Sequence, residues 1–355
     1  MVRSSLASVR ACMLALLLLP GAPLLAAARQ ADYPNTSNFG LVPDQNAVWY
    51  KHCLRVQHRQ APTRDLTPLP PQTKAKACAA GKLYYEKRNQ ANTSQGEWDQ
   101  VRRCALASDD SAVLMMLYAN GLGVAQDADL AIKYACSGEA ALAEMEARVL
   151  HLVNLQADTR RFDQCDDITS GRMGAVCAWI ATEQSGKLRS AFLARLRARL
   201  TPAQQASLDV LVKASDRFAH AFGNDETDMG GTAGVQMVID AEAREQEWLR
   251  EHLAAFERGQ FKLPAAEQFD LADAELNQAY ARVMQSPATE PGHPGRLPNS
   301  TVDKQGVRAT QRAWLAYRDA WIRFAAQRYP ALDQAALKAA LTQWRTKQLA
   351  RLVRE

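Results

Sequence analysis

Residues 311–330 have the sequence QRAWLAYRDAWIRFAAQRYP, which holds two tryptophans, two tyrosines, a phenylalanine and four arginines. The large apolar side chains here and just upstream recur at steps of seven, three, four and three, at Val307, Trp314, Tyr317, Trp321 and Phe324. Residues at this spacing lie on one face of an α-helix. The pattern predicts a helix from about Val302 to Tyr329 whose aromatic stripe is buried in a helical core, and Pro330 predicts its end.

Helical spacing continues on both sides of this stretch. Phe269 to Met284 and Leu332 to Leu352 each carry an apolar face, and the segment 286–300 between the first two helices contains four prolines and two glycines, which predicts an irregular loop. Upstream, the helical period from Leu188 to Leu211 is broken at Thr201-Pro202, a favourable N-cap and first-turn pair. Alternating strand patterns are scarce, so we predict an all-α fold.

Cysteine and charge are unevenly distributed along the 355 residues. Residues 262–355 contain fourteen Lys and Arg against nine Asp and Glu, a net charge of +5. Because Arg3 and Arg10 add +2 and the whole chain carries +5, residues 29–261 must carry −2. This asymmetry, and a length above that of one typical domain, predict separate units. We predict a signal peptide (1–28), a cysteine-containing helical repeat domain (29–200), bridging helices (201–261) and a small C-terminal helical domain (262–355).

The first residues have the features of a secretory signal peptide. Arg3 and Arg10 provide its positive charge, Met13 to Leu19 its apolar run, and the alanines before Arg29 its cleavage site. No later stretch is apolar for long enough to cross a bilayer. We therefore predict a protein without a transmembrane segment that is exported to the periplasm and cleaved near Ala28.

Six cysteines follow the predicted signal peptide: Cys53, Cys78, Cys104, Cys136, Cys165 and Cys177. An even number in an oxidising compartment predicts three disulfides. A zinc site would need cysteine or histidine ligands at tight spacing, such as C-x-x-C, and we predict no metal because the sequence lacks this pattern. Six cysteines allow fifteen pairings, and all of them stay open at this level.

Residues 112–138, AVLMMLYANGLGVAQDADLAIKYACSG, predict an αα-hairpin. Gly121 and Gly123 supply the turn, since glycine adopts positive φ without a steric penalty. The order of Tyr118, the two glycines, Asp127 and Tyr134 resembles the Sel-one-like helical repeat, a relative of the tetratricopeptide repeat. Such repeats stack because one hairpin cannot bury its own apolar face. The resemblance implies a scaffold for protein interactions, and Tyr118, Gly121 and Gly123 are expected to form the core and turn of the repeat.

Polar residues border the aromatic stripe of the C-terminal helices. Arg318 lies one turn beyond Trp314, where a cation–π contact is expected. Polar groups at the edge of an aromatic core usually join helices by hydrogen bonds. We expect such interhelical bonds from Asn277, Gln311, Arg318 and Asp319.

Two motifs in this region resemble a known family. LADAELNQAY (271–280), followed after a loop by TQRAWLAYRDAW (310–321), is similar to the LprI-like lysozyme inhibitor domain of exported bacterial proteins, and the resemblance covers about 265–355. The matching residues are Ala272, Asp273, Leu276, Asn277, Tyr280, Gln311, Arg312, Ala313, Trp314, Tyr317, Arg318 and Asp319. Members commonly carry cysteines that clamp these helices, whereas this segment has none. Apolar packing, including Trp321 and Trp344, must hold it together.

The resemblance implies binding and inhibition of lysozyme, with no catalysis. It also nominates a set of motif residues, most of them expected to be structural: Asp273, Asn277, Tyr280, Gln311, Trp314, Tyr317, Arg318 and Asp319. Animal lysozymes are basic, and so is this segment, and surfaces of like charge disfavour association. A basic face would instead suit an acidic component of the cell envelope.

We predict a non-catalytic, exported binding protein, a lysozyme inhibitor or envelope-stress factor, which needs no cofactor and does not bind nucleic acid. One alternative is a repeat-based adaptor whose C-terminal module recognises envelope components. A second is a penicillin-interacting enzyme of the cysteine-rich repeat type. The sequence lacks the Ser-x-x-Lys pattern expected of a penicillin-reactive serine, which disfavours the second alternative.

Overall fold

The computed structural model describes residues 32–36, 42–67, 78–155, 160–289 and 291–353. Within these ranges the chain forms α-helices, short 3-10 turns and one isolated β-bridge between Arg296 and Asp303, but no strand. The predicted all-α fold is confirmed. None of the helices in these ranges is long and apolar enough to span a bilayer. The predicted signal peptide and its cleavage site at Ala28 lie outside the described residues.

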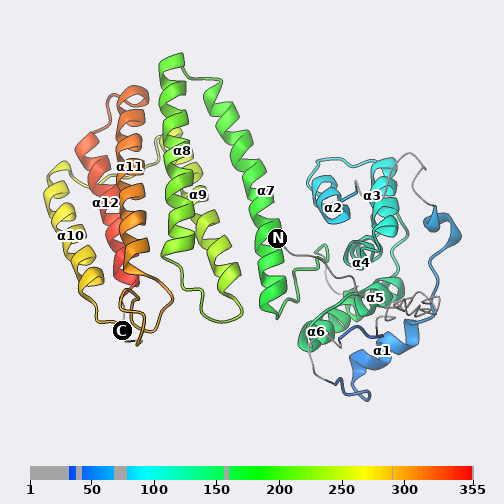
Figure 1. The fold of residues 1–355 in the computed structure, drawn as a ribbon. Helices are drawn as coiled ribbons and strands as arrows, with labels where there is room; N and C mark the ends of the chain where they lie inside the picture. Colours follow the sequence, from blue (N-terminus) through cyan, green and yellow to red (C-terminus); the bar gives the residue numbers. More distant parts are fainter. Residues whose placement is uncertain (1–31, 37–41, 68–77, 156–159, 290, 354–355) are drawn as a thin grey trace, which may run out of the picture.

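The N-terminal part consists of six short helices around one core (Figure 1). They are α1 (Val48–Val56), α2 (Ala80–Arg88), α3 (Gln95–Ala107), α4 (Ser111–Asn120), α5 (Ala128–Ser137) and α6 (Leu142–Val153). Side-chain caps begin several of them: Ser94 and Glu97 form a capping box on α3, and Asp127 accepts from the amide of Leu130 on α5. A 3-10 helix, η2 (Thr63–Leu66), lies inside the proline-rich segment 61–72, where its one turn fits between Pro62 and the next proline.

The αα-hairpin predicted from residues 112–138 is present as α4 and α5. Gly121 and Gly123 have φ values of +64° and +70°, the left-handed conformation that the turn requires. At Gly123 a Cβ atom would lie 2.5 Å from the Cβ of Trp98 on α3, so glycine is needed there for close packing as well. The turn is therefore in close contact with α3.

Three disulfides connect this part of the chain, as predicted from the cysteine count. Cys53 of α1 is bonded to Cys136 of α5, Cys78 before α2 to Cys104 of α3, and Cys165 to Cys177 of the next helix. The Cys53–Cys136 bond joins residues 83 positions apart and ties the first helix to the hairpin. The structure thus selects one of the fifteen possible pairings.

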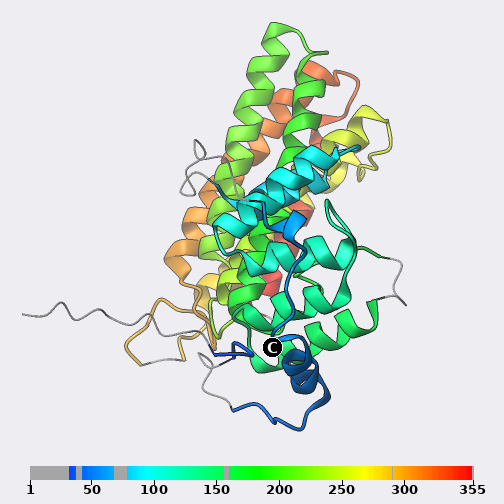
Figure 2. The same cartoon turned by 90° about the vertical axis from the view of Figure 1, so that its right-hand side faces the viewer.

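Helix α7 (Gly171–Arg197) leads from the N-terminal part to a bundle of long helices. In Figure 1 it lies between the two parts, and Figure 2, viewed from the side of the short helices, shows them in front of the bundle. Helix α7 packs along α9, and its first turn touches the loop before α9 closely: a Cβ on Gly171 would lie 2.0 Å from the carbonyl oxygen of Thr232. The two parts are therefore connected by a continuous helix.

The bundle comprises α8 (Pro202–Asp225), α9 (Gly234–Glu257), α10 (Phe269–Gln285), α11 (Lys304–Arg328) and α12 (Gln334–Arg351). The three predicted C-terminal helices agree with α10 to α12 to within about two residues at each end. Thr201 caps α8 with its side chain, as the sequence predicted, and Pro202 occupies the first turn. Helix α11 packs on α8 and α12, and α12 packs on α10 (Figure 1).

One hydrophobic core runs through the bundle from Leu196 to Leu349. It includes Leu208, Phe218 and Leu253 from α8 and α9 as well as the aromatic stripe of α11. Helices α8 and α9, which we had expected to act as a bridge between domains, therefore complete the core of the C-terminal helices. The buried apolar residues of α10, α11 and α12 that the structure describes share one cluster with those of α8 and α9.

Candidate functional site

The aromatic stripe of α11 is a core element. Trp314, Tyr317, Trp321 and Phe324 are each at most 1% exposed. Tyr317 stacks on Phe218 of α8 with 5.6 Å between ring centroids, and its hydroxyl accepts a 2.9 Å hydrogen bond from Nε1 of Trp321. Burial raises the pKa of the Tyr317 hydroxyl far above its ordinary value. The stripe thus holds α8 and α11 together and offers no surface to a partner.

A buried ion pair lies beside this stripe. The guanidinium of Arg345 on α12 donates to both carboxylate oxygens of Glu226, at 2.8 and 2.5 Å, and both side chains are fully buried. Arg345 Nε also donates to Oε1 of Gln311 on α11 at 2.9 Å. Bidentate geometry and a third acceptor are what a buried guanidinium needs to offset its lost hydration. Arg345 therefore joins the end of α8 to α11 and α12.

The network continues to α9 through Gln348. Its Nε2 donates to Oε1 of Glu245 at 2.8 Å, whereas Oε2 of Glu245 has no hydrogen-bond partner among the described residues. Burial raises the pKa of Glu245 to about 8, since the positive charge of Arg345 is already matched by Glu226. The side chain of Glu245 is therefore largely protonated and neutral at pH 7.

Sequence analysis missed Arg345, Glu226, Glu245 and Gln348. The sequence of α12 does indicate part of this network. One face of the helix is formed, at steps of four, four and three, by Leu337, Leu341, Arg345 and Gln348. An arginine and a glutamine on an apolar stripe indicate a buried polar network. Their acidic partners lie on distant segments, and nothing in the local sequence identifies them.

Of the four polar motif residues expected to form hydrogen bonds between helices, one does so. Gln311 makes an interhelical hydrogen bond, to Arg345. Asn277 instead donates to Asp273 on its own helix at 3.2 Å, and Arg318 donates to Asp319 at 3.1 Å. Asn277 and Asp319 are exposed, and neither they nor Arg318 make a side-chain hydrogen bond to another helix among the described residues. The guanidinium of Arg318 also lies 5.2 Å from the ring centroid of Trp314, as expected for a cation–π pair.

The exposed face of α10 has the opposite charge to the helices beside it. Glu267 in the turn before α10, Asp270 and Glu275 are exposed, and Leu271 among them is 62% exposed. Helix α11 carries six basic residues against Asp319, and α12 carries four basic residues and no acid. Helix α10 lies at the outer edge of the bundle (Figure 1). The basic net charge of the segment therefore coexists with a locally acidic face, defined here as Glu267, Asp270, Leu271 and Glu275. Tyr280 and Asp273 of the motif are partly buried on the same helix.

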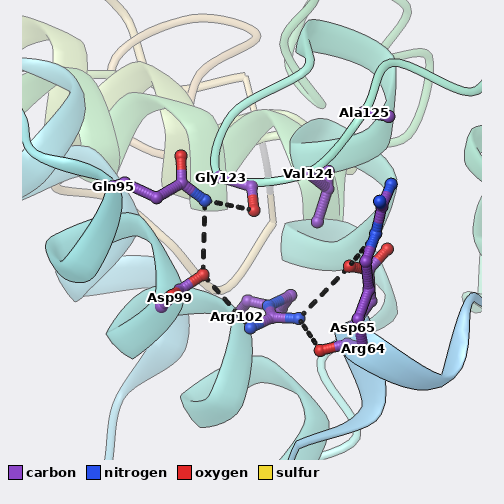
Figure 3. A pocket seen from close by; sticks show the side chains of 8 residues that line it. All are labelled: Arg64, Asp65, Gln95, Asp99, Arg102, Gly123, Val124 and Ala125. Carbon is purple, nitrogen blue, oxygen red and sulfur yellow. Dashed lines mark hydrogen bonds and ion pairs between the residues drawn. The ribbon is translucent and has the colours of Figure 1, made fainter.

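A polar pocket of about 380 Å³ lies in the N-terminal part, between η2, α3 and the turn of the hairpin (Figure 3). Arg102 forms its floor and donates to the carbonyl of Arg64 at 3.1 Å and to Asp99 at 3.1 Å, and its distance to Asp65 is 3.5 Å. Figure 3 shows Gln95 donating to the carbonyl of Gly123 on the opposite wall, at 2.8 Å. The charges of the pocket are thus largely compensated by one another.

This pocket explains the position of Tyr118, which the repeat pattern singled out. Tyr118 stacks on Tyr134 with 5.7 Å between ring centroids, and its hydroxyl donates to Asp65 at 3.1 Å. Burial raises the pKa of Tyr118 above its ordinary range, and the carboxylate of Asp65 adds to that effect. The arrangement fastens η2 to the hairpin and contains no pairing of a nucleophile with a base. Among the described residues, no group of three or more His, Cys, Asp or Glu side chains could hold a metal ion.

No curated protein and no solved structure matches the chain significantly. The family model described as "Lysozyme inhibitor LprI" matches residues 259–349, the segment that runs from the end of α9 to α12.

Proposed function

We propose that this is an exported binding protein whose C-terminal bundle binds and inhibits a lysozyme. The observation that carries this proposal is the match of residues 259–349 to the lysozyme inhibitor family. The three disulfides support export, because disulfides persist in oxidising compartments. The αα-hairpin with its glycine turn supports a Sel-one-like repeat scaffold in the N-terminal part.

The acidic face of α10 is the surface that we assign to the lysozyme. A basic enzyme is repelled by α11 and α12, but it meets complementary charge at Glu267, Asp270 and Glu275. Leu271 provides an exposed apolar side chain in the middle of this face. A central apolar contact within a charged rim is typical of protein interfaces.

The test uses the full mature chain, because the core of the bundle includes α8 and α9. Hen-type lysozyme is assayed on cell walls while the protein is titrated at low and moderate salt. We expect saturable inhibition near one-to-one that weakens as salt rises, since charge pairs at the rim are screened. Absence of inhibition by the folded protein at either salt concentration would contradict the proposal.

Charge reversal tests the assigned surface. The triple variant Glu267→Lys, Asp270→Lys and Glu275→Lys should weaken inhibition at least about tenfold, which corresponds to roughly 1.4 kcal/mol. A matched triple variant at exposed acids elsewhere, Glu86→Lys, Glu146→Lys and Glu251→Lys, changes the net charge equally. Equal loss in both variants would mean that net charge alone acts, and α10 would not be the interface.

A further inference from the structure

An open groove of about 380 Å³ separates the N-terminal part from the first half of α7. Its apolar lining consists of Tyr85 from α2, Val113 from α4 and Val176, Trp179 and Ile180 from α7. This volume is within the range of about 300–1,000 Å³ that is usual for small-molecule sites. The groove is distinct from the acidic face of α10 and lies in the other part of the molecule.

Trp179 is the exposed aromatic residue of this groove. Its side chain is 58% exposed, whereas Trp49, Trp98, Trp314 and Trp321 are at most 7% exposed. Val176 on the same side of α7 is 41% exposed. An indole has a large apolar face and one N–H donor, so it binds ligands that are apolar on one side and polar at the edge. Its position in a concave site, beside a second exposed apolar side chain, indicates a ligand platform.

The floor of the groove is fixed by hydrogen bonds. The hydroxyl of Tyr85 donates to Asp163 at 2.8 Å and accepts from Gln164 at 3.2 Å. Asp110 caps α4 by accepting from the amide of Val113 at 3.0 Å. Burial raises the pKa of Tyr85 to about 12, so its hydroxyl keeps its proton. These bonds hold the floor rigid before any ligand arrives.

The rim of the groove, in contrast, carries polar side chains without partners. Lys82 on α2 and Glu183, Gln184 and Lys187 on α7 line the groove, and none of them makes a hydrogen bond or an ion pair among the described residues. They supply donors and acceptors of both signs around Trp179. The lining contains two lysines and two acids, Glu183 and the capping residue Asp110, so it has no net charge to attract a polyanion or a polycation.

We propose that this groove binds a neutral oligosaccharide, with a sugar ring stacked on Trp179. A pyranose ring presents C–H groups on its faces and hydroxyl groups at its edge, which match an indole platform surrounded by uncommitted donors and acceptors. Gln184 and Lys82 bind the edge of the ring, and Val176 and Ile180 contact its apolar substituents. A peptide fits less well, because the apolar surface is concentrated at one indole instead of a row of side-chain pockets.

The experiment is a titration of the full mature protein with β-1,4-linked N-acetylglucosamine tetramer, followed by calorimetry and tryptophan fluorescence. Cellotetraose, which lacks the acetamido groups, is titrated in parallel. We expect saturable binding of at least one of them, with a change in fluorescence from Trp179. Preference for the first sugar would assign a role to the acetamido group, and equal binding would assign recognition to the hydroxyl groups.

Two variants decide whether the binding site is this groove. Trp179→Ala should weaken binding at least about tenfold, and Gln184→Ala about threefold. Leu188→Ala is the matched control, because Leu188 is on the same helix and 69% exposed but does not line the groove. Helix content by circular dichroism shows that each variant is folded.

The proposal is overturned by no saturable sugar binding at millimolar concentration, by unchanged binding in Trp179→Ala, or by equal loss in Leu188→Ala. It is also overturned if unstructured peptides change the tryptophan fluorescence and neither sugar does. None of these results depends on lysozyme inhibition.

Discussion

Helices α1 to α6 are 9 to 13 residues long, whereas α8 to α12 have 17 to 25 residues. The short helices are tied by disulfides, and the long ones contain no cysteine. An isolated helix shorter than about 12–15 residues is marginal in water. Short helices therefore need packing and covalent links, whereas a long helix can carry a continuous apolar stripe that stabilises it against several neighbours.

Both parts contain buried ion pairs: in the N-terminal part, Arg148 donates to Glu144 of the same helix at 2.8 Å, and both side chains are at most 7% exposed. In the N-terminal part, Arg102 is buried beside Asp65 and Asp99 near an open pocket. In the bundle, Arg345 and Glu226 are removed from solvent completely. The parts differ instead in their links: disulfides connect the short helices, whereas the bundle is held by aromatic packing and by an ion pair that joins α12 to the end of α8. Each of the following predictions tests one side of that contrast.

Removal of the Cys53–Cys136 bond should have the largest effect. Because it closes a loop of 83 residues, its loss in Cys53→Ala/Cys136→Ala should cost about 4.5 kcal/mol by the chain-entropy relation. Cys165→Ala/Cys177→Ala opens a loop of only 12 residues and should cost about 3 kcal/mol. Urea unfolding of both variants measures the difference. A larger loss in the second variant would show that loop length does not govern stability here.

Breaking the buried ion pair should have a comparable effect on the bundle. Arg345→Met leaves Glu226 buried without its cation, which should cost about 3–5 kcal/mol. Arg312→Met removes an exposed arginine of α11 and should change stability by less than about 0.5 kcal/mol. Adding Glu226→Gln to Arg345→Met should recover part of the loss, because the orphaned charge is removed. Chemical denaturation at pH 7 tests the set, and no recovery in the double variant would contradict the role of charge burial.

Sequence analysis found the bundle more readily than its interior contacts. The stripe from Val307 to Phe324 and the Thr201-Pro202 pair are local signals, and both predicted the observed helices well. The Arg345–Glu226 pair joins residues 119 positions apart, so it depends on how α8 and α12 pack. Local periodicity carries no information about such a pairing.

The same limit applies in the N-terminal part. The glycine turn of the hairpin was predicted because Gly121 and Gly123 act within a few residues. Asp65 lies in the proline-rich segment 61–72, which carries no helical apolar spacing, although its carboxylate accepts a hydrogen bond from Tyr118 and lies 3.5 Å from Arg102. The disulfide pairing could not be predicted from the sequence either, since six cysteines allow fifteen pairings. The groove around Trp179 brings α2, α4 and α7 together, and its composition follows from tertiary packing alone.

The protonated Glu245 should make the bundle less stable as pH rises. Its pKa in the folded protein, about 8, is above that of an unfolded glutamate, about 4.3. Between these values the unfolded chain has lost a proton that the native state retains, so stability falls with increasing pH. Compared with the wild type, Glu245→Gln should gain about 3 kcal/mol of relative stability between pH 5 and pH 8, because its side chain cannot ionise. Parallel unfolding curves at these two pH values measure the gain, and a constant difference between the proteins would exclude ionisation at this site.

Substitution at Gly123 should have the smallest effect, and its matched control should have the opposite sign. Gly123→Ala places a Cβ at a φ of +70° and 2.5 Å from the Cβ of Trp98, so we expect a loss of about 2 kcal/mol in the N-terminal part. Gly96 lies in the first turn of α3 with no atom within 4 Å of an added Cβ, so Gly96→Ala should raise stability by up to about 1 kcal/mol. Thermal unfolding of both variants tests whether the hairpin turn is pressed against α3 in solution. If Gly123→Ala were as stable as Gly96→Ala, the contact between the turn and Trp98 would be looser than in the structure. The disulfides would then hold the short helices without help from this close packing.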